Sequence, residues 1–467
     1  MDAMLLQPQA WAAAQFGSAQ LGDRRRSQRL VKLATQVAAN PSDSFPDQTE
    51  VWGDLKAAYR LFDCAEVTFA AIASPHWQQT RGNSSGRCLI LDDTTEIDFH
   101  PKRQIRGLGP VGNGHGQGFL LHSGLMVAAD SDRLYGLAGQ LIYYRKSVAK
   151  KETRTQRLKR DRESGIWGQL IEQIGSPPPG AVWIHVMDRG GDDFENLWRC
   201  QKHRVGWIAR AKSLNRKVAT PSGEESELQG YLAVLPVAGR YVLELRARPG
   251  QAARAAQLEV RLGPLLMPPP RLKSPALKAE RPTAIPQWVV EVRETNPPAD
   301  VEPIHWVLYT SESAQTLPEA RDIVAAYEKR WLIEEWHKAL KTGCQVQKRQ
   351  LETAKRLEGV VGLMSVEAVR LLQLKAAART APDRPAEEFV PARYVAALRM
   401  VRKPKRNTAA TEPWSVRRFY RELAGLGGFL GRKGDGEPGW ITLWRGWEKL
   451  HWMLRGADCL ARLQGRE

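Results

Sequence analysis

The sequence contains few cysteines, and their spacing gives no sign that they act together. The chain has five, scattered along its length: Cys64, Cys88, Cys200, Cys344 and Cys459. They form no C-x-x-C pair and no cluster with histidine, which argues against a disulfide framework and against a zinc site. We therefore expect a protein of the reducing cytoplasm.

Long apolar segments are also absent from the sequence. No apolar run approaches the ~18–20 residues that a membrane span requires. The stretch MDAMLLQPQAWAAAQF has no basic start before its short apolar part, so we expect no signal peptide. Internal repeats and heptad arrays are not found either. These absences favour a globular chain of two or three domains that has no membrane partner.

Positive charge is in excess. The chain has 69 lysines and arginines against 51 acidic residues, a formal net charge of +18. A surplus of this size indicates a polyanionic partner. A basic bias shared by the whole proteome is the alternative explanation.

The first part of the chain changes from helical to alternating patterns. Residues 1–70 read as helices, and the next segments read as strands at 87–99, 119–130 and 134–145, a basic helix at 151–175, a strand at 181–188 and a further helix. Three strands, a helix, a fourth strand and a helix is the opening order of an RNase H-like fold.

The second part interrupts that order and then resumes it. Residues 213–300 contain β-like runs with polar turns, after which a strand at 304–311 and a helix at 325–343 return to the earlier pattern. From about residue 355 onward the chain reads as helical. We therefore predict an α/β fold in which residues 71–370 form an RNase H-like core, a mixed sheet flanked by helices, with a β-rich subdomain inserted at about 213–300. Helical domains are expected at 1–70 and 371–467.

The expected helix at 325–343 carries charged residues at regular intervals. Tyr327, Arg330, Glu334 and Lys341 fall on one narrow stripe at 100° per residue, and Lys338 falls on the same stripe. Leu332, Ile333, Trp336 and Leu340 lie on the opposite side, which can be buried. An ordinary amphipathic helix with a solvated charged face would show the same pattern.

Two further acids stand in strongly apolar surroundings. Asp93 lies in LILDDTT, and Asp188 ends VWIHVMD. A single acid of this kind is more often a cap or a hydrogen-bonded turn residue, but together with Glu334 the two provide three carboxylates from distant segments. Hard oxygen ligands suit Mg²⁺ or Mn²⁺, and two such ions can clamp the attacking and leaving oxygens of a phosphodiester. Arg330 and Lys341 would then hold phosphates.

These residues resemble a known family. Tyr327, Arg330, Glu334 and Lys341 match the Y-(2)-R-(3)-E-(6)-K signature of bacterial cut-and-paste DDE transposases, the insertion-sequence family best known from a kanamycin-resistance composite transposon. Asp93 in DDTT and Asp188 in DR match the family's first two catalytic acids. Patterns near both ends, W…LGDxRR…RL with AYR and GGFLGRKGDGEPGWITLWRGWEKL, also match. One departure is Gly190–Gly191, which we expect to loosen the loop after Asp188.

The resemblance implies a function and roles for individual residues. The protein would bind the terminal inverted repeats of its element, nick the DNA, form and resolve a hairpin, and join the 3′-OH ends to target DNA. Asp93, Asp188 and Glu334 would hold two Mg²⁺ ions, which Mn²⁺ could replace, and the protein would act as a homodimer on paired ends. Trp306 would stack on a flipped base, and the remaining expected DNA contacts are Tyr327, Arg330, Lys338, Lys341, Arg210, Lys212, Arg25, Arg26, Arg29 and Arg60.

Several alternatives stay open at this point. Trp306 could be a plain core residue, and Arg210 and Lys212 could be solvated charges. The same metal chemistry would serve a nuclease that performs no strand transfer. A catalytically silent protein that binds the DNA ends and inhibits or represses transposition would carry the same end-binding segments.

Overall fold

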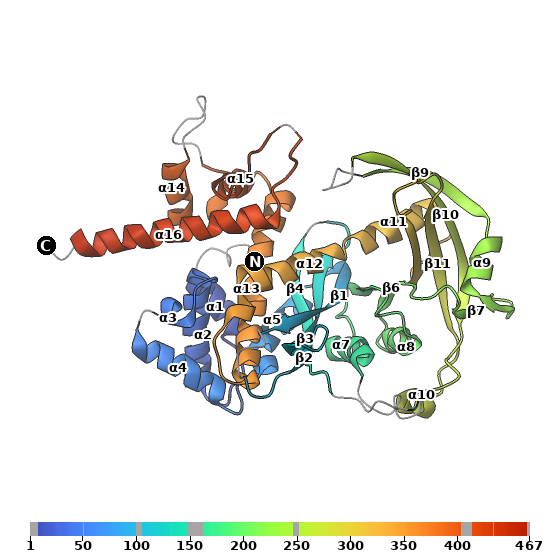
Figure 1. Ribbon diagram of the computed structural model, residues 1–467, viewed down its shortest axis with the longest axis horizontal. Helices are drawn as coiled ribbons and strands as arrows, with labels where there is room; N and C mark the ends of the chain where they lie inside the picture. The colour runs from blue at the N-terminus through green and yellow to red at the C-terminus, as the bar shows by residue number, and fades with distance from the viewer. Residues whose placement is uncertain are drawn as a thin grey trace.

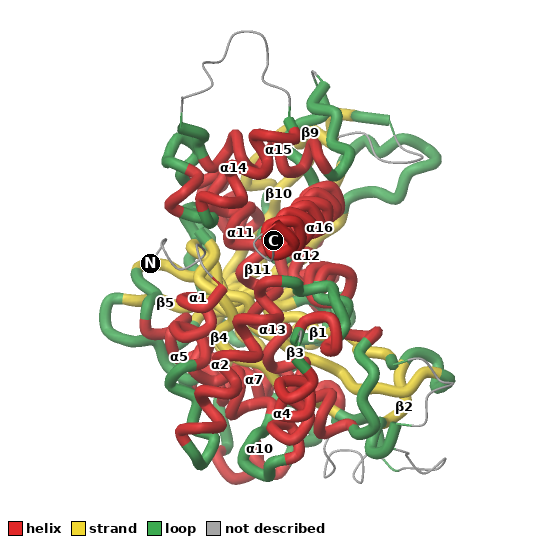
Figure 2. The backbone as a smooth tube through the Cα atoms, turned by 90° about the vertical axis from the view of Figure 1, so that its left-hand side faces the viewer, coloured by secondary structure: helices red, strands yellow, loops and turns green. Residues whose placement is uncertain are grey.

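The computed structural model describes residues 8–49, 51–99, 105–131, 133–146, 153, 162–245, 252–402, 413–432 and 434–464. Within these residues the chain is a mixed α/β structure. Its strands form one mixed sheet with helices on both faces, and the helices from the two ends of the chain gather on the left of Figure 1. Figure 2 shows the same strands from the side, surrounded by helices.

Largely apolar sequences, several of them buried over nearly their whole length, form the central strands. These are β1 (Gly86–Asp98), β2 (Gly109–Val111), β3 (Gly116–Ala128), β4 (Leu134–Tyr143), β5 (Ala181–Met187) and β6 (Gly206–Arg210). They lie in the order β4-β3-β1-β5-β6, with β2 on the edge of β3. β1 runs antiparallel to β3 and parallel to β5, and β6 runs parallel to β5. The four strands expected from the sequence in this region are therefore confirmed.

The inserted segment continues the same sheet. It contains β7 (Lys217–Ala219), β8 (Glu225–Glu227), α9 (Leu228–Val234), β9 (Val237–Leu245), β10 (Arg254–Met267), α10 (Pro275–Glu280) and β11 (Ile285–Glu294). β12 (His305–Thr310) pairs with β6 on one side and with β11 on the other. The insertion is thus rich in strands, as expected, but its strands extend the central sheet through β12 and it includes two short helices.

Two apolar layers cover the sheet. Because side chains alternate along a strand, Leu89 and Leu91 of β1 join the layer beneath α12 (Trp331–Lys338) and α13 (Ala354–Thr380). Cys88 and Ile90 join the opposite layer, beneath α7 (Ile166–Ile174) and α8 (Phe194–Lys202). The next two residues of β1 are both aspartates, so the same alternation directs them to opposite faces.

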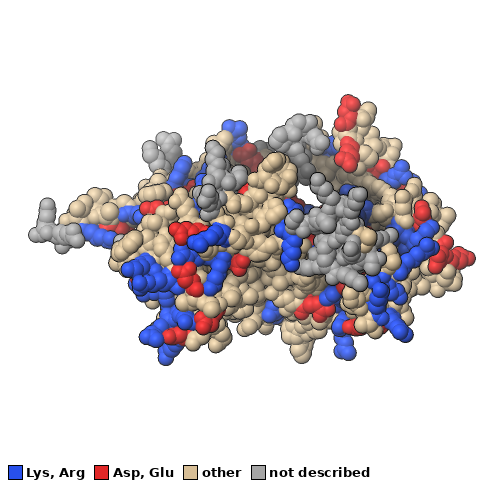
Figure 3. All heavy atoms as spheres, turned by 60° about the horizontal axis from the view of Figure 1, so that its bottom comes forward, with Lys and Arg blue, Asp and Glu red and all other residues tan. Residues whose placement is uncertain are grey.

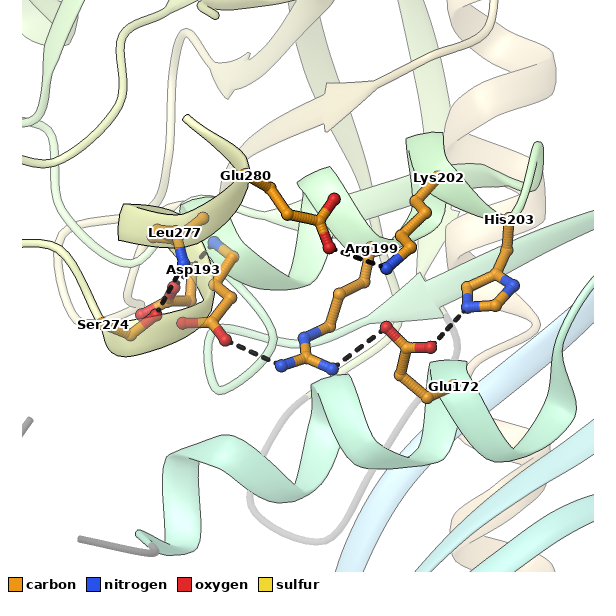
Figure 4. Close-up of polar contacts among 9 residues, drawn as sticks. Glu172, Asp193, Arg199, Lys202, His203, Ser274, Leu277 and Glu280 are labelled. Atoms are coloured by element: carbon orange, nitrogen blue, oxygen red, sulfur yellow. Dashed lines mark hydrogen bonds and ion pairs between the residues drawn. The ribbon is translucent and has the colours of Figure 1, made fainter. Parts of the chain in front are cut away.

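The layer beneath α7 and α8 is closed at its outer side by polar contacts (Figure 4). Arg199 of α8 contacts Glu172 of α7 at 3.1 Å. It also pairs with Glu195 of its own helix at 2.8 Å. His203 contacts Glu172 at 2.7 Å, and Lys202 contacts Glu280 of α10 at 3.0 Å. The insertion is thereby tied to the helices of the core. Residues 154–161, the basic half of the helix expected at 151–175, lie outside the described residues.

Helices form both ends of the chain, as expected. The first group comprises α1 (Pro8–Phe16), α2 (Arg24–Ala39), α3 (Phe45–Gln48), α4 (Trp52–Asp63) and α5 (Phe69–Gly82), and the last comprises α13 with α14 (Ala392–Val401), α15 (Val416–Leu426) and α16 (Trp440–Gln464). The expected domain limits at 70 and 370 fall inside α5 and α13. The C-terminal half of α16 projects beyond the body of the molecule (Figure 1).

The single helix expected at 325–343 is divided. α11 (Leu317–Glu328) ends before Arg330, α12 follows, and a π-helical turn covers Ala339–Gly343. The break between α11 and α12 is a tight turn in which the Arg330 N–H donates to the Tyr327 carbonyl at 3.0 Å. The π-helical turn closes where the Cys344 N–H donates to the Ala339 carbonyl at 2.9 Å. A π turn inserts an extra residue and shifts the later side chains around the helix, so the 100° rule does not place them.

Candidate active site

Two neighbouring parallel strands position the two aspartates. Asp93 lies within β1, on the face that packs under α12, and Asp188 directly follows the end of β5. The Thr94 N–H donates to Asp93 Oδ1 at 2.8 Å, and the Gly190 N–H donates to Asp188 Oδ1 at 2.6 Å. Each carboxylate is thus held by a backbone donor of its own segment.

The loop after Asp188 is tightly packed, contrary to the expectation that Gly190–Gly191 would loosen it. A Cβ added at Gly190 would lie 2.9 Å from Asp188 Oδ1 and 3.0 Å from the Trp167 ring. One added at Gly191 would lie 2.5 Å from the Met187 side chain. The glycines therefore let the backbone approach the acid closely.

Arg330 joins the acid of β1 to the acid of α12. Its Nη1 lies 3.2 Å from Asp93 Oδ2, and its Nη2 lies 2.6 Å from Glu334 Oε1. The Asp93 and Arg330 side chains are mostly buried, at 17% and 18% exposed, while Glu334 is 42% exposed. A single guanidinium thus supplies the positive charge between two of the three predicted acids.

The charges of Asp188 and Glu334 both act on Asp93. Burial raises the pKa of Asp93 to about 6, the charge of Arg330 opposes this rise, and the carboxylates of Asp188 and Glu334 add to it. Within the described residues no group of three Asp, Glu, His or Cys side chains is arranged to hold a metal ion as it stands. The donor set still fits one in kind, because carboxylate oxygens are the ligands that Mg²⁺ and Mn²⁺ prefer.

An aromatic pair stands beside the acids. The Tyr327 and Trp306 rings meet edge to face with centroids 5.7 Å apart. Burial raises the pKa of the Tyr327 hydroxyl, with Arg330 and Arg210 opposing the rise and Asp188 adding to it. The structure therefore brings Trp306, Tyr327 and Arg210 to the acids. Lys212 has an exposed side chain, and its backbone N–H bonds Asp192 Oδ2 at 2.7 Å.

The two lysines of the expected stripe differ in direction. Lys341 is partly buried, and burial lowers the pKa of its ammonium group although the carboxylates of Glu96, Asp93 and Asp98 oppose that shift. Lys338 is exposed and covers the Trp331 ring, with its Nζ 4.9 Å from the ring centroid. The structure thus places Lys341 toward the acids and Lys338 on the outer surface.

One neighbour of the acids was not anticipated from the sequence. His337 is buried with its Nδ1 4.0 Å from Asp93 Oδ2, and burial lowers its pKa to about 3, so the imidazole is neutral. Its position three residues after Glu334 was the only signal, because residues three apart share a helix face.

The predicted arginines of the N-terminal helices lie on an outer surface. Asp23 caps α2 and bonds Arg25 at 2.9 Å, Arg26 pairs with Glu66 at 2.7 Å, and Arg29 pairs with Asp54 at 2.6 Å. Arg60 is exposed. Figure 3 shows lysine and arginine side chains gathered over these helices at its left, with acidic side chains between them. This surface can bind a polyanion, although Arg25, Arg26 and Arg29 already form ion pairs with acidic side chains of the same helices and loops.

Two known protein families match the two ends of the chain. The family described as transposase DNA-binding matches residues 8–67, which covers α1 to α4. The family described as the Tn5 transposase dimerisation domain matches residues 366–464, from within α13 to the end of α16. The matches support a transposase family of the Tn5 type, whose members are DNA-processing enzymes.

These matches also bear on partners. A DNA-binding domain and a dimerisation domain in one chain support DNA and a second copy of the chain as partners. No helix in the part of the chain that the structure describes is both long and apolar enough to cross a membrane.

Proposed function

We propose that this protein is a DDE transposase that moves its element by a cut-and-paste route. It binds the terminal inverted repeats of the element and catalyses strand nicking, hairpin formation, hairpin resolution and joining of the 3′-OH ends to target DNA. The observation that carries the proposal is the bridge from Arg330 to Asp93 and Glu334, with the charge of Asp188 acting on Asp93, in a chain whose two ends match transposase DNA-binding and dimerisation families.

The arrangement of strands supports an RNase H-like core. In the sheet the strands lie in the order β4-β3-β1-β5-β6, with β3 antiparallel to β1 and with β5 and β6 parallel to it. From the sequence we expected only the order of these elements along the chain, which is three strands, a helix, a fourth strand and a helix. In this core Asp93 would come from β1, Asp188 from the end of β5, and Glu334 from α12, which covers them.

Asp93, Asp188 and Glu334 would hold two Mg²⁺ ions, which Mn²⁺ could replace. When bound, the ions supply a stronger nucleophile and neutralise charge on the attacking and leaving oxygens. Arg330 would exchange its carboxylate partners for a DNA phosphate, since a guanidinium binds both in the same forked geometry. Lys341 and Tyr327 would hold neighbouring phosphates.

The bond changes follow from this arrangement. Water attacks the phosphodiester at the end of the element, the P–O bond to the 3′ oxygen breaks, and a 3′-OH is released. That 3′-OH attacks a phosphodiester of the opposite strand, and the two strands join in a hairpin as the P–O bond to the flanking DNA breaks and the flanking 3′-OH leaves. A second water hydrolyses the joining phosphodiester and frees the 3′-OH of the element again. Stacking of a flipped base on Trp306 would stabilise the distorted end by ~1–3 kcal/mol.

The test separates binding from cleavage. We expect Asp93→Ala, Asp188→Ala and Glu334→Ala each to abolish cleavage of a labelled duplex that carries the inverted repeat, while each still shifts that duplex in a native gel. Arg60→Ala is the reciprocal control and should weaken the shift. Loss of specific binding in all three acid variants would contradict separate roles, and cleavage surviving in all three would remove the acids from the chemistry.

A further inference from the structure

A buried pair of polar side chains lies directly behind the acids. Asp92 of β1 and His185 of β5 are 2% and 0% exposed, and His185 Nδ1 lies 2.7 Å from Asp92 Oδ2. Asp92 is adjacent to Asp93 but projects to the other face of the sheet, into the layer beneath α7 and α8. The pair therefore does not face the side on which Arg330 and Glu334 lie.

The Asp92–His185 pair lies where the backbone pairing of β1 with β5 ends. Backbone pairing of β1 with β5 runs from Gly86↔Ala181 to Leu91↔Val186 and stops there. Asp93 and Asp188 both lie beyond this last backbone pair. The Asp92–His185 bond links the same two strands where the backbone ladder ends, one residue before Asp93 and three before Asp188.

The pair is costly to bury. Asp92 Oδ1 and His185 Nε2 have no hydrogen-bond partner among the described residues. Leaving a buried polar atom unsatisfied costs about 1–3 kcal/mol, and apolar residues of similar size are often at least as stabilising as a buried charged pair. Stability alone therefore gives no reason for this choice of residues.

The neighbouring strand leaves room for the pair. Gly124 of β3 faces Asp92, and a Cβ added there would lie 3.0 Å from Asp92 Oδ1 and 2.8 Å from Ile90 Cγ2. The glycine lets the carboxylate stay within the layer and reach across to β5. Three adjacent strands thus contribute to one local arrangement.

We propose that Asp92 and His185 are positioning residues whose hydrogen bond fixes the separation of Asp93 and Asp188. The inference rests on the proposed function, in which these two acids and Glu334 hold divalent cations. A side-chain bond at the end of the ladder restrains both strand ends from behind and leaves the carboxylates themselves open toward the opposite face. Groups that orient metal ligands commonly account for 10–100-fold in metal affinity.

The experiment measures Mn²⁺ binding to the full-length protein by electron paramagnetic resonance, at a temperature where circular dichroism shows every variant folded. We expect His185→Ala to weaken binding about 10-fold or more. Asp92→Asn keeps an acceptor oxygen for the imidazole N–H, and it should bind Mn²⁺ nearly as the wild type does. The double variant Asp92→Ala/His185→Leu removes the bond but leaves no unpaired polar atom, so it should fold well and still bind weakly.

A matched control lies on the same strand. The Trp183 Nε1–H donates to Ser84 Oγ at 3.0 Å, a buried bond near the opposite end of β5. Ser84→Ala should lower the melting temperature without changing Mn²⁺ affinity. If His185→Ala binds Mn²⁺ as tightly as the wild type, or if Ser84→Ala weakens binding equally, the positioning role is wrong.

The proposed function is tested separately in the same series. Wild-type binding that Glu334→Ala removes supports that function whatever His185→Ala does. Wild-type protein that binds no Mn²⁺ would overturn both ideas, whereas unchanged binding in His185→Ala alone would overturn only the positioning role.

Discussion

At the scale of residues, charge balance explains the site as it stands. The Arg330 guanidinium pairs with Asp93 and Glu334, and the Asp93 carboxylate is mostly buried and lies within the electrostatic influence of Asp188 and Glu334. Such a cluster is unfavourable unless cations are present. Function and stability therefore oppose one another at Asp93.

The raised pKa of Asp93 makes the stability of the folded protein depend on pH. The pKa of Asp93 is about 6 in the folded protein and ~3.9 in an unfolded chain. Protonation of Asp93 therefore favours the folded state, and this stabilisation is fully present below pH ~4 and is lost as the pH rises through about 6. In the presence of a chelator, Asp93→Asn should therefore be more stable than the wild type at pH 7.5, by up to about 3 kcal/mol, and the difference should disappear near pH 4. Denaturant unfolding at the two pH values measures this.

A control of opposite sign is available in the N-terminal helices. Hydrogen bonds from Lys32 and Arg29 hold the pKa of Asp54 below its usual value, despite the raising effect of burial. Asp54→Asn should consequently destabilise the protein at pH 7.5 and have less effect at low pH. A pH-independent effect of Asp93→Asn would contradict the assigned pKa.

Trp306 gives a kinetic prediction at the same scale. It is only partly buried and lies against Tyr327, so Trp306→Ala should slow hairpin formation more than the first nick because only the hairpin needs a distorted DNA end. Loss of ~1–3 kcal/mol of stacking corresponds to roughly 5–150-fold. Trp288→Ala, a partly buried tryptophan on the adjacent β11, is the control in single-turnover kinetics. Equal slowing of both steps by Trp306→Ala would remove the stacking role.

At the scale of elements, α12 is held in place by the long helix behind it. Lys375 of α13 bonds both oxygens of Glu335 at 2.5 and 2.6 Å, with both side chains 7% exposed. Trp336 adds a buried bond from its indole N–H to the Ser365 carbonyl at 3.2 Å. The side of α12 opposite the acids is thus fixed by polar as well as apolar contacts.

Removing one partner of this ion pair should be far more harmful than removing both. Lys375→Met leaves the Glu335 charge buried without its cation and should cost about 3–5 kcal/mol of unfolding free energy. Glu335→Leu/Lys375→Met should be close to neutral for stability. Urea unfolding of the four proteins of the cycle measures the coupling, and a double variant as unstable as Lys375→Met would show that the pair does not act as a unit.

At the scale of the whole molecule, the projecting half of α16 exposes several large apolar side chains. Trp452, Leu460 and Leu463 are 63%, 62% and 65% exposed, and the helix lies within the region that matches the dimerisation family. Large apolar side chains gathered on one projecting helix are typical of an interface between proteins.

Charges placed on this helix should separate the dimer. We expect Leu460→Glu/Leu463→Glu to sediment as a monomer under conditions in which the wild type sediments as a dimer. Val234→Glu replaces another exposed apolar residue, 79% exposed on α9, and should leave the dimer intact. A double variant that stays dimeric would place the interface elsewhere.

The sequence predicted the features that depend on local spacing. The acids in apolar strands, the charged segment around Glu334 and the helical ends all follow from patterns within some twenty residues. The partnership of Asp92 with His185 could not be predicted, because the two lie on different strands that only the fold brings together. The division of the helix at 325–343 was also hidden, because the tight turn between Tyr327 and Arg330 interrupts the helix without a glycine or proline to mark it.

Long-range pairing limited the prediction of the insertion. Its strands were predicted from β-like runs separated by polar turns, but such runs do not reveal which strand lies beside which. The pairing of β12 with both β6 and β11 merges the insertion into the central sheet, and nothing in either strand alone indicates that. Ion pairs such as Arg26–Glu66 were likewise invisible, because the acid lies on another segment.

The measurement that tests the account most directly is the order of DNA products. Purified protein, Mg²⁺ and a labelled duplex carrying the element's inverted repeat are sampled over time on a denaturing gel. The account predicts a nick, then a hairpin, then an opened double-strand break, all absent in Glu334→Ala. Binding of the duplex without cleavage in either Mg²⁺ or Mn²⁺ would contradict it and favour a catalytically silent end-binding protein.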